Sequence, residues 1–289
     1  MITGRRRSAL YVPGDRAGML EKAPGLPADM LILNLEDGVA SARKDEARAN
    51  VVRALQGLDF AGREVVVRIN SPASGAGRED LRAVVPCRPD GICLPKVDDA
   101  GEIRAADTAL FELESYFGIP QMKIRLHAMI ESAAGLLHAA EIARASRRMS
   151  SLMFGSADYA RDVRCRVGED RWELWFALQM TVASARAAGI DALDAPCFDM
   201  RNAELLGREA DQARRLGYEG KCAIHPGQLE LLNKIFEVTP EEIAWAEKVL
   251  AELDAAESSG RAMATLEGRL IENPHRAAAE RILLRRPRH

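Results

Sequence analysis

Cysteine and histidine are both scarce in this chain of 289 residues, which contains five of each. The cysteines are odd in number and show no CxxC spacing, so the sequence predicts neither a disulfide framework nor a zinc site made of thiolates. No second histidine stands at ligand spacing from His225, which argues against a zinc centre built on histidine. We therefore expect the cysteines to be buried, inert thiols.

Long apolar runs and an excess of charge are missing as well. No run approaches the ~20 residues that span a bilayer, and the first residues, MITGRRRSALYV, lack the apolar region and cleavage site of a signal peptide. The formal net charge of -3 gives no general attraction to nucleic acid or to anionic membranes. The basic clusters at residues 5–7 and 285–289 are expected to be solvated tails. The sequence predicts a cytoplasmic protein without a nucleic-acid or membrane partner.

The sequence does contain a recurring pattern of short, nearly continuous apolar runs. Eight of them are found, at residues 8–14, 29–37, 64–70, 91–97, 123–132, 151–158, 189–196 and 220–226. Such runs are typical of parallel strands that are covered on both faces. The segments between them show helical periodicity, and one of these, residues 174–189, closes on Gly189 as a helix C-cap should. Eight βα units in ~220 residues predict a (β/α)8 TIM barrel, with a doubly wound sheet as the alternative.

The segment after the eighth run has its own helix signals. Thr239 is a candidate N-cap, Pro240 suits the first helical position and Glu242 completes a capping box. A turn containing glycine, a short apolar stretch, a proline stop and a last amphipathic helix follow. We expect a catalytic barrel at residues 1–236 and a helical appendage at residues 237–289. Within the barrel, the Gly/Ser-rich segment 70–80 is either a plain loop or a mobile lid.

Polar residues follow the predicted strands at their C-terminal ends, where the eight loops of a barrel converge. Two carboxylates on neighbouring strands suit Mg²⁺, which keeps water and substrate oxygens as its remaining ligands. An arginine within an apolar strand needs an anionic partner, and its planar fork suits a carboxylate. These features favour a Mg²⁺ barrel that acts on a carboxylate. The residues concerned are Glu36, Asp37, Arg68, Asn70, Lys96, Glu131, Asp158, Asp194 and His225.

The same residues allow a purely structural interpretation. Barrel interiors contain structural ion pairs, so the acids and bases could form one closed network of Glu36, Asp37, Glu131, Asp158, Arg68 and Lys96. At least four acids against two or three bases leave an excess of negative charge, which favours a bound cation over a closed network. His225 is equally compatible with a satisfied histidine at the rim.

Eight motifs at these positions occur in order along the chain: RSALYVPG, ADMLILNLEDGV, VVVRIN, LPKV, MIES, FGSADYA, GIDALDAP and GYEGKCAIHPGQL. Together they resemble the citrate lyase beta subunit and malyl-CoA or citramalyl-CoA lyase group of the HpcH/HpaI aldolase superfamily. The resemblance implies a Mg²⁺-dependent (β/α)8 lyase, commonly a trimer or a dimer of trimers. It also implies cleavage of a 3-hydroxyacyl-CoA thioester into an acyl-CoA and a 2-oxo acid.

The resemblance implies roles for the residues at the metal end of the site. Glu131 and Asp158 match the metal ligands of the family, and Arg68 matches the arginine that binds the carboxylate of the oxo acid. Glu36 and Asp37 match the catalytic acids beside the metal and its waters, where a charge orients ligands and tunes their basicity.

Other positions match contacts to the substrate. Tyr11 and Lys22 correspond to coenzyme A contacts, while Gly18 stands where relatives often have another lysine. Ile224 and His225 fall where the family contacts substrate.

Two departures from the family pattern concern charged groups. Asn34 stands where the family usually has aspartate, so one charge is missing near the metal end. Glu272 stands where the family has the aspartate of a GxxID segment, a catalytic acid/base that a neighbouring subunit often delivers. The longer side chain keeps the carboxylate, although an acid/base has to lie within ~3 Å of its proton. Because Pro274 and a helix follow, Glu272 could instead be a helix-end residue favoured by the helix dipole.

Three alternative functions stay open at this point. A class II aldolase of the same superfamily would act on free hydroxy-oxo acids and would not need coenzyme A. A subunit of a citrate lyase complex would act on a carrier-protein thioester. A non-catalytic, ligand-binding barrel would explain Asn34 and Glu272 as marks of lost catalysis.

Overall fold

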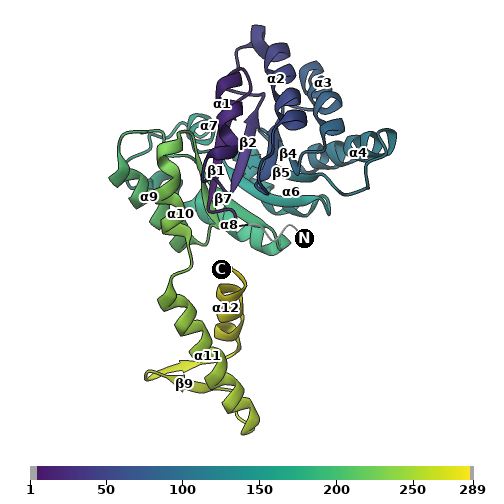
Figure 1. Cartoon of the computed structure of the whole chain (residues 1–289). Helices are drawn as coiled ribbons and strands as arrows, with labels where there is room; N and C mark the ends of the chain where they lie inside the picture. The colour runs from purple at the N-terminus through teal and green to yellow at the C-terminus, as the bar shows by residue number, and fades with distance from the viewer. Residues whose placement is uncertain (1–4, 287–289) are drawn as a thin grey trace. The chain divides into compact units, whose positions relative to one another are not determined.

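The computed structural model describes residues 5–286, and the chain divides between Phe236 and Glu237 into two compact units. The first unit contains all eight strands of a barrel, and the second contains two helices and a small hairpin. Figure 1 shows the two units, with the barrel in purple to green and the second unit in green to yellow. No helix in the described part of the chain is long and apolar enough to cross a membrane.

Eight parallel strands pair in sequence order and close into a barrel, because β8 pairs with β1. This closure confirms the predicted TIM barrel and excludes a doubly wound sheet, and each predicted apolar run overlaps one strand. The strands are β1 (Ser8–Pro13), β2 (Met30–Asn34), β3 (Glu64–Arg68), β4 (Gly91–Leu94), β5 (Arg125–Ile130), β6 (Met149–Phe154), β7 (Asp191–Asp194) and β8 (Gly220–Ala223).

Both faces of the strands are buried, which explains their continuous apolar sequence. In β2, Leu31 and Leu33 pack in the cluster that the helices cover, while Met30 and Ile32 belong to a second cluster inside the barrel. The inner cluster is rich in sulfur and includes Met129. Side chains that alternate along a strand thus serve two separate cores.

Ten helices of the described chain surround or connect these strands. They are α1 (Ala17–Lys22), α2 (Lys44–Gly57), α3 (Gly75–Val84), α4 (Ala100–Tyr116), α5 (Ala133–Leu137), α6 (Ala139–Arg144), α7 (Ser156–Asp162), α8 (Trp175–Ala188), α9 (Ala203–Leu216) and α10 (Leu229–Phe236). Helix α8 ends at Gly189 in the left-handed conformation (φ 69°), as predicted. The expectation of a loop over residues 70–80 is wrong from Gly75 onward, because Ser74 caps α3 there through a hydrogen bond from the Gly77 N–H (3.0 Å).

The N-terminal end of the barrel is closed by buried ion pairs. Arg6 binds both carboxylate oxygens of Glu64 (2.7 and 2.6 Å) and also Asp191 (2.8 Å). His127 is buried beside them, with Nδ1 at 2.8 Å from the hydroxyl of Ser151. This end is therefore filled by structural side chains, and space for a ligand lies at the opposite end.

The second unit consists of α11 (Pro240–Ser258), β9 (Ala264–Leu266), β10 (Arg269–Ile271) and α12 (Asn273–Leu284). The predicted capping box is present, since Thr239 Oγ1 accepts from the Glu242 N–H (3.2 Å) and Glu242 accepts from the Thr239 N–H (2.8 Å). The β9–β10 hairpin lies where only an apolar stretch was expected. Its two-residue turn, Glu267-Gly268, has positive φ at both positions, as a type I′ turn requires.

Candidate active site

A cavity of about 360 Å³ lies at the C-terminal ends of the barrel strands. Six of the ten residues to which the family resemblance gave a role line it, and they come from six different strands or the loops that follow them. These residues are Tyr11, Asp37, Arg68, Glu131, Asp158 and Ile224. The barrel thus brings together residues that are far apart in the sequence.

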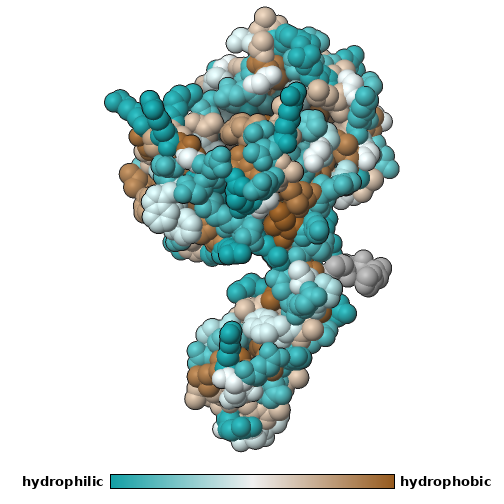
Figure 2. Space-filling model, turned by 90° about the vertical axis from the view of Figure 1, so that its left-hand side faces the viewer, coloured by the Kyte–Doolittle hydropathy of each residue, from teal (hydrophilic) through white to brown (hydrophobic). Residues whose placement is uncertain are grey.

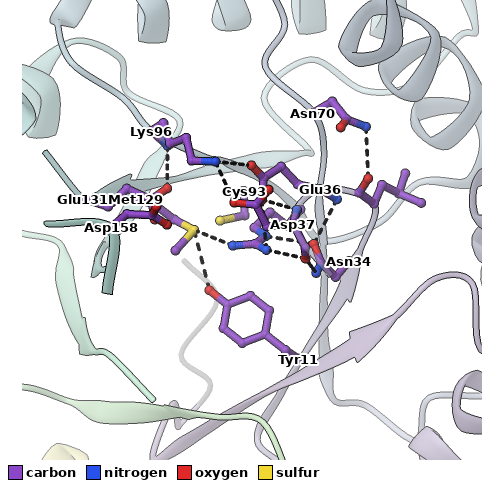
Figure 3. Close-up of polar contacts among 12 residues, drawn as sticks. Tyr11, Asn34, Glu36, Asp37, Asn70, Cys93, Lys96, Met129, Glu131 and Asp158 are labelled. Carbon is purple, nitrogen blue, oxygen red and sulfur yellow. Dashed lines mark hydrogen bonds and ion pairs between the residues drawn. The ribbon is translucent and has the colours of Figure 1, made fainter. Parts of the chain in front are cut away.

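Four charged groups beside the cavity form a compact ion-pair network (Figure 3). Lys96 Nζ binds Glu36 (2.8 Å) and Asp37 (2.6 Å), and Arg68 binds Glu36 (3.1 Å). Partial burial tends to raise the pKa of Asp37, but the adjacent ammonium of Lys96 outweighs it and the pKa is lowered. Two acids therefore balance two bases, and these four residues need no further ion.

Glu131 and Asp158 lie outside this network. Glu131 follows β5, is 4% exposed, and accepts a hydrogen bond from the backbone N–H of Lys96 (2.7 Å), not from its ammonium. Asp158 is in the first turn of α7 and pairs with the exposed Arg161 (2.7 Å). The single closed network of six groups, which the sequence left open, is therefore not what the structure contains.

The environment of Glu131 fits a bound cation. Burial raises the pKa of this carboxyl to about 7, and the nearby negative charge of Asp158 adds to the increase. Gly155 leaves room for the group, because a Cβ at that position would lie 2.5 Å from Glu131 Oε2. A divalent cation between the carboxylates would remove the cost of the buried charge.

The donor set also matches the chemistry of Mg²⁺. The described residues contain no group of three or more His, Cys, Asp or Glu side chains that would enclose a metal. Mg²⁺ prefers oxygen donors and keeps several waters, so one or two carboxylates plus substrate oxygens suffice. Glu131 and Asp158 are the residues that would hold it.

Arg68 points from the end of β3 into the cavity with one edge of its guanidinium only weakly paired. Its Nε donates to Asn34 Oδ1 (2.8 Å) and one terminal nitrogen donates to the Asp37 carbonyl (3.0 Å). Within residues 5–286, the other terminal nitrogen has only the sulfur of Met129 (3.4 Å) as a hydrogen-bond partner, and sulfur is a weak acceptor. The guanidinium also lies 5.0 Å from the ring centroid of Tyr11. Arg68 is thus held in place and keeps donor capacity for an anion.

Comparison with known proteins identifies the family of this chain. Residues 7–226 match the model of the HpcH/HpaI aldolase/citrate lyase family, and residues 176–288 match that of carbon–carbon bond lyases of the TIM-barrel fold. The chain belongs to the HpcH/HpaI aldolase/citrate lyase family. The family predicted from the eight motifs is confirmed.

Relatives within the HpcH/HpaI aldolase/citrate lyase family cover nearly the whole chain. Citrate lyase subunit beta of Leuconostoc mesenteroides subsp. cremoris is 35% identical over 96% of this chain and 92% of its own. A (3S)-malyl-CoA thioesterase of Cereibacter sphaeroides is 36% identical over 96% and 93%. The structure of CitE from Mycobacterium tuberculosis in complex with magnesium, acetoacetate and coenzyme A has a TM-score of 0.78, 30% identity and 99% coverage of both chains.

Asn34, a departure from the family pattern, is integrated into the site. Its Oδ1 accepts from Arg68 Nε (2.8 Å) and from the Glu36 N–H (3.0 Å), and its Nδ2 donates to the Asp37 carbonyl. An aspartate could accept the first two bonds but could not donate the third. The amide therefore replaces the lost charge with one additional hydrogen bond, a role that the sequence analysis missed.

Several predicted residues do not line the cavity. Glu36 is buried behind it, and Lys22 is exposed at the end of α1. His225 is exposed and its Nδ1 accepts from the Gly227 N–H (3.1 Å), which agrees with a histidine at the rim. Asp194 is buried between Lys221 (2.7 Å) and Arg171 (2.9 Å), so it is satisfied by the protein.

Glu272 belongs to the second unit, where it is the exposed N-cap residue of α12. Its N–H donates to Nδ1 of His275 (3.2 Å). A carboxylate at a helix N-terminus is favoured by the dipole, so the structural interpretation of this residue stays open beside the catalytic one.

Proposed function

We propose that this protein is a Mg²⁺-dependent carbon–carbon lyase that cleaves a 3-hydroxyacyl-CoA thioester of the malyl, citramalyl or citryl type. The products are an acyl-CoA and a 2-oxo acid. One observation carries the proposal: the cavity combines a fixed guanidinium that has a weakly paired donor edge with two carboxylates outside the ion-pair network. The names of the relatives and the magnesium and coenzyme A in the CitE complex support it.

The reaction needs a carboxylate anchor, charge neutralisation and a proton donor. Arg68 binds the carboxylate of the future oxo acid through its weakly paired edge, and Tyr11 and Asn34 hold the guanidinium in that orientation. Glu131 and Asp158 would hold Mg²⁺, which would neutralise the charge that develops on the substrate oxygens. Glu36 keeps Arg68 and Lys96 in place through its two ion pairs. Of the two neighbouring acids Glu36 and Asp37, it is Asp37 that lines the cavity.

Cleavage turns the substrate hydroxyl into the carbonyl of the oxo acid and releases the hydroxyl proton. The electrons of the broken carbon–carbon bond go to the α-carbon of the acyl thioester, which must then accept a proton. We assign this proton transfer to Glu272, delivered from a neighbouring subunit of a trimer or hexamer. Two observations support this assignment: Glu272 lies in the GRLIEN segment, and its side chain is exposed in the second unit. Exposed aromatic side chains such as Trp172 and Phe176 (69% and 64%) support an oligomer, and Figure 2 shows hydrophobic patches among the hydrophilic surface. The cytoplasmic location stays a prediction.

The test is incubation of the purified protein with Mg²⁺ and malyl-CoA, citramalyl-CoA or citryl-CoA, followed by assay of the released 2-oxo acid and acyl-CoA. Equal amounts of both products support the lyase. Turnover of free hydroxy-oxo acids alone would indicate a class II aldolase, and activity only with a carrier-protein thioester would indicate a citrate lyase subunit. Tight binding without turnover of any substrate would indicate a non-catalytic barrel.

Hydrolysis of the thioester is a second candidate, because relatives at 36% identity are named malyl-CoA thioesterases. Hydrolysis releases free coenzyme A and a hydroxy acid, whereas the lyase releases neither. Titration of free thiol in the same reaction separates the two activities.

A further inference from the structure

We propose that Met129 is a positioning residue, whose thioether supports the substrate-binding edge of Arg68 without blocking it. The inference rests on the role proposed for Arg68 and goes beyond it, because it assigns a function to a neutral side chain that takes no part in the bond cleavage. A carboxylate can replace the thioether as the partner of Arg68 easily. A stronger acceptor at this position would fill the edge before the substrate arrives.

The guanidinium of Arg68 has oxygen acceptors on one side and sulfur on the other. Its Nε donates to Asn34 Oδ1 (2.8 Å), and one terminal nitrogen donates to the Asp37 carbonyl (3.0 Å). The second terminal nitrogen donates to Met129 Sδ (3.4 Å), and a thioether is a weak acceptor. Hydrogen bonds from a charged donor to oxygen are the strong kind. The oxygens therefore fix the orientation of Arg68, and the sulfur leaves its edge exchangeable.

Met129 is itself held in place by its surroundings. It belongs to the inner core cluster, is 5% exposed and lines the cavity. The Tyr11 hydroxyl donates to the same sulfur (3.6 Å), and Figure 3 shows both donors directed at it. Burial raises the pKa of Tyr11 well above its usual value, so this hydroxyl remains a donor at neutral pH. One sulfur thus accepts from two donors, which an aliphatic side chain could not do.

Two substitutions of similar size separate packing from acceptor strength. Met129→Leu fills the volume and accepts no hydrogen bond. Met129→Gln has nearly the length of methionine and brings an amide oxygen, which can accept from both Arg68 and Tyr11. A carboxylate has to displace this oxygen from the edge of Arg68 in Met129→Gln, whereas nothing has to be displaced in Met129→Leu.

Binding of pyruvate to the Mg²⁺-loaded protein measures the effect without any turnover. In calorimetric titration, Met129→Gln should bind pyruvate at least ~10-fold more weakly than the native protein, because a hydrogen bond between the guanidinium and the amide oxygen has to be broken. Met129→Leu should bind it within ~3-fold of the native protein or more tightly. An equal loss in both variants, or no loss in Met129→Gln, would overturn the inference.

Thermal unfolding without ligand distinguishes competition for Arg68 from damaged packing. The amide oxygen of Met129→Gln pairs with the donors of Arg68 and Tyr11, which Met129→Leu leaves without this acceptor. Met129→Gln should therefore melt at a temperature at least as high as Met129→Leu. The more stable variant is then the weaker binder, an order that a merely structural role would not produce. A lower melting temperature of Met129→Gln would overturn the inference, because the amide would then not accept these bonds.

Turnover separates this inference from the proposed function. In the condensation of an oxo acid with an acyl-CoA, Met129→Gln should raise KM for the oxo acid at least ~10-fold and leave kcat within ~3-fold. An unchanged KM in an active lyase would sink the inference alone. If no thioester is cleaved or formed while the order of pyruvate affinities holds, the proposed function fails and the inference stands. A native protein that binds no pyruvate would overturn the role of Arg68 and the inference together.

Discussion

Single residues of the cavity differ in whether the protein itself satisfies their charge. Glu36 and Asp37 have Lys96 and Arg68 as partners, whereas Glu131 is buried with a raised pKa and a backbone donor. This contrast is the structural reason for assigning the metal to Glu131 and Asp158. This assignment and the role proposed for Arg68 each make one residue-level prediction.

Glu131→Gln should abolish metal-dependent turnover while leaving the fold intact, because the neutral amide keeps the size of the side chain but not its charge. Mg²⁺ should raise the melting temperature of the native protein and should no longer do so in the variant, since a ligand stabilises only the state that binds it. Glu36→Gln is a matched control that should keep the Mg²⁺ shift. Full activity of the native protein in EDTA would contradict the assignment.

Arg68→Lys keeps the positive charge but loses the planar fork. We expect a loss of roughly 2 to 4 kcal/mol in transition-state binding, which should appear mainly in the kinetic constants for the oxo acid and less in those for the acyl-CoA. The measurement is kcat/KM for the oxo acid in the condensation direction. Unchanged kinetics for the oxo acid would show that Arg68 does not bind its carboxylate.

The residues at strand ends could be predicted because parallel strands covered on both faces present their polar residues at one end of the barrel. Which groups then pair could not be predicted. Lys96 adopts a left-handed backbone (φ 49°), which is uncommon for a residue other than glycine. From this position its N–H contacts Glu131 while its ammonium contacts Glu36. Met129 could have been predicted to line the cavity, because it lies two residues before Glu131 and its side chain therefore points to the same side of the chain.

At the scale of elements, the strands and long helices were predictable and the short elements were not. Runs such as residues 29–37 are far more apolar than the segments beside them, and cap residues such as Gly189 mark the ends of helices. Each strand of the β9–β10 hairpin has three residues, of which one is buried, so no periodicity marks it. Lys22 and His225 match family motifs, but their side chains are exposed because of where α1 and the loop after β8 place them.

The buried histidine at the N-terminal end of the barrel should make the stability of the fold depend on pH. Burial lowers the pKa of His127 well below its usual value, and Arg6 adds to the decrease. Glu64, 3.7 Å from Nε2, does not reverse it because Arg6 already binds both of its oxygens. Below pH ~6.5 the unfolded chain therefore gains a proton at this residue that the folded chain does not bind.

The free energy of unfolding should consequently fall as the pH is lowered from about 6.5, with His127 contributing up to about 1.4 kcal/mol per pH unit. In His127→Gln this contribution is absent, so the decline should be shallower. Urea unfolding of both proteins between pH 7 and pH 5 measures the difference. Equal slopes would mean that His127 is protonated in the folded barrel.

At the scale of the whole molecule, the proposed chemistry needs both units, since the barrel binds the substrate and Glu272 lies in the second unit. Glu272→Gln should lower turnover at least ~100-fold and stop exchange of acyl-CoA α-protons with D₂O, within the range of general acid–base catalysis. Glu272→Asp should retain or raise activity. Mixed oligomers of Glu272→Gln and Arg68→Lys subunits should regain activity if a neighbour delivers the acid.

A loss of thermal stability in Glu272→Gln, with turnover and exchange both kept, would instead make Glu272 a helix-end residue. The acid/base would then have to be sought elsewhere. Asp37 would be the first candidate, because it is the acid of the ion-pair network that lines the cavity.

The central claim is that the cavity at the C-terminal ends of the strands cleaves a carbon–carbon bond next to a carboxylate with the help of Mg²⁺. The most direct measurement follows malyl-CoA and citramalyl-CoA by mass spectrometry, with Mg²⁺ and with EDTA, in the native protein and in Glu131→Gln. We predict equimolar acyl-CoA and 2-oxo acid from the native protein with Mg²⁺, and neither product with EDTA or in the variant. Formation of free coenzyme A and hydroxy acid, or equal turnover with and without Mg²⁺, would contradict the account.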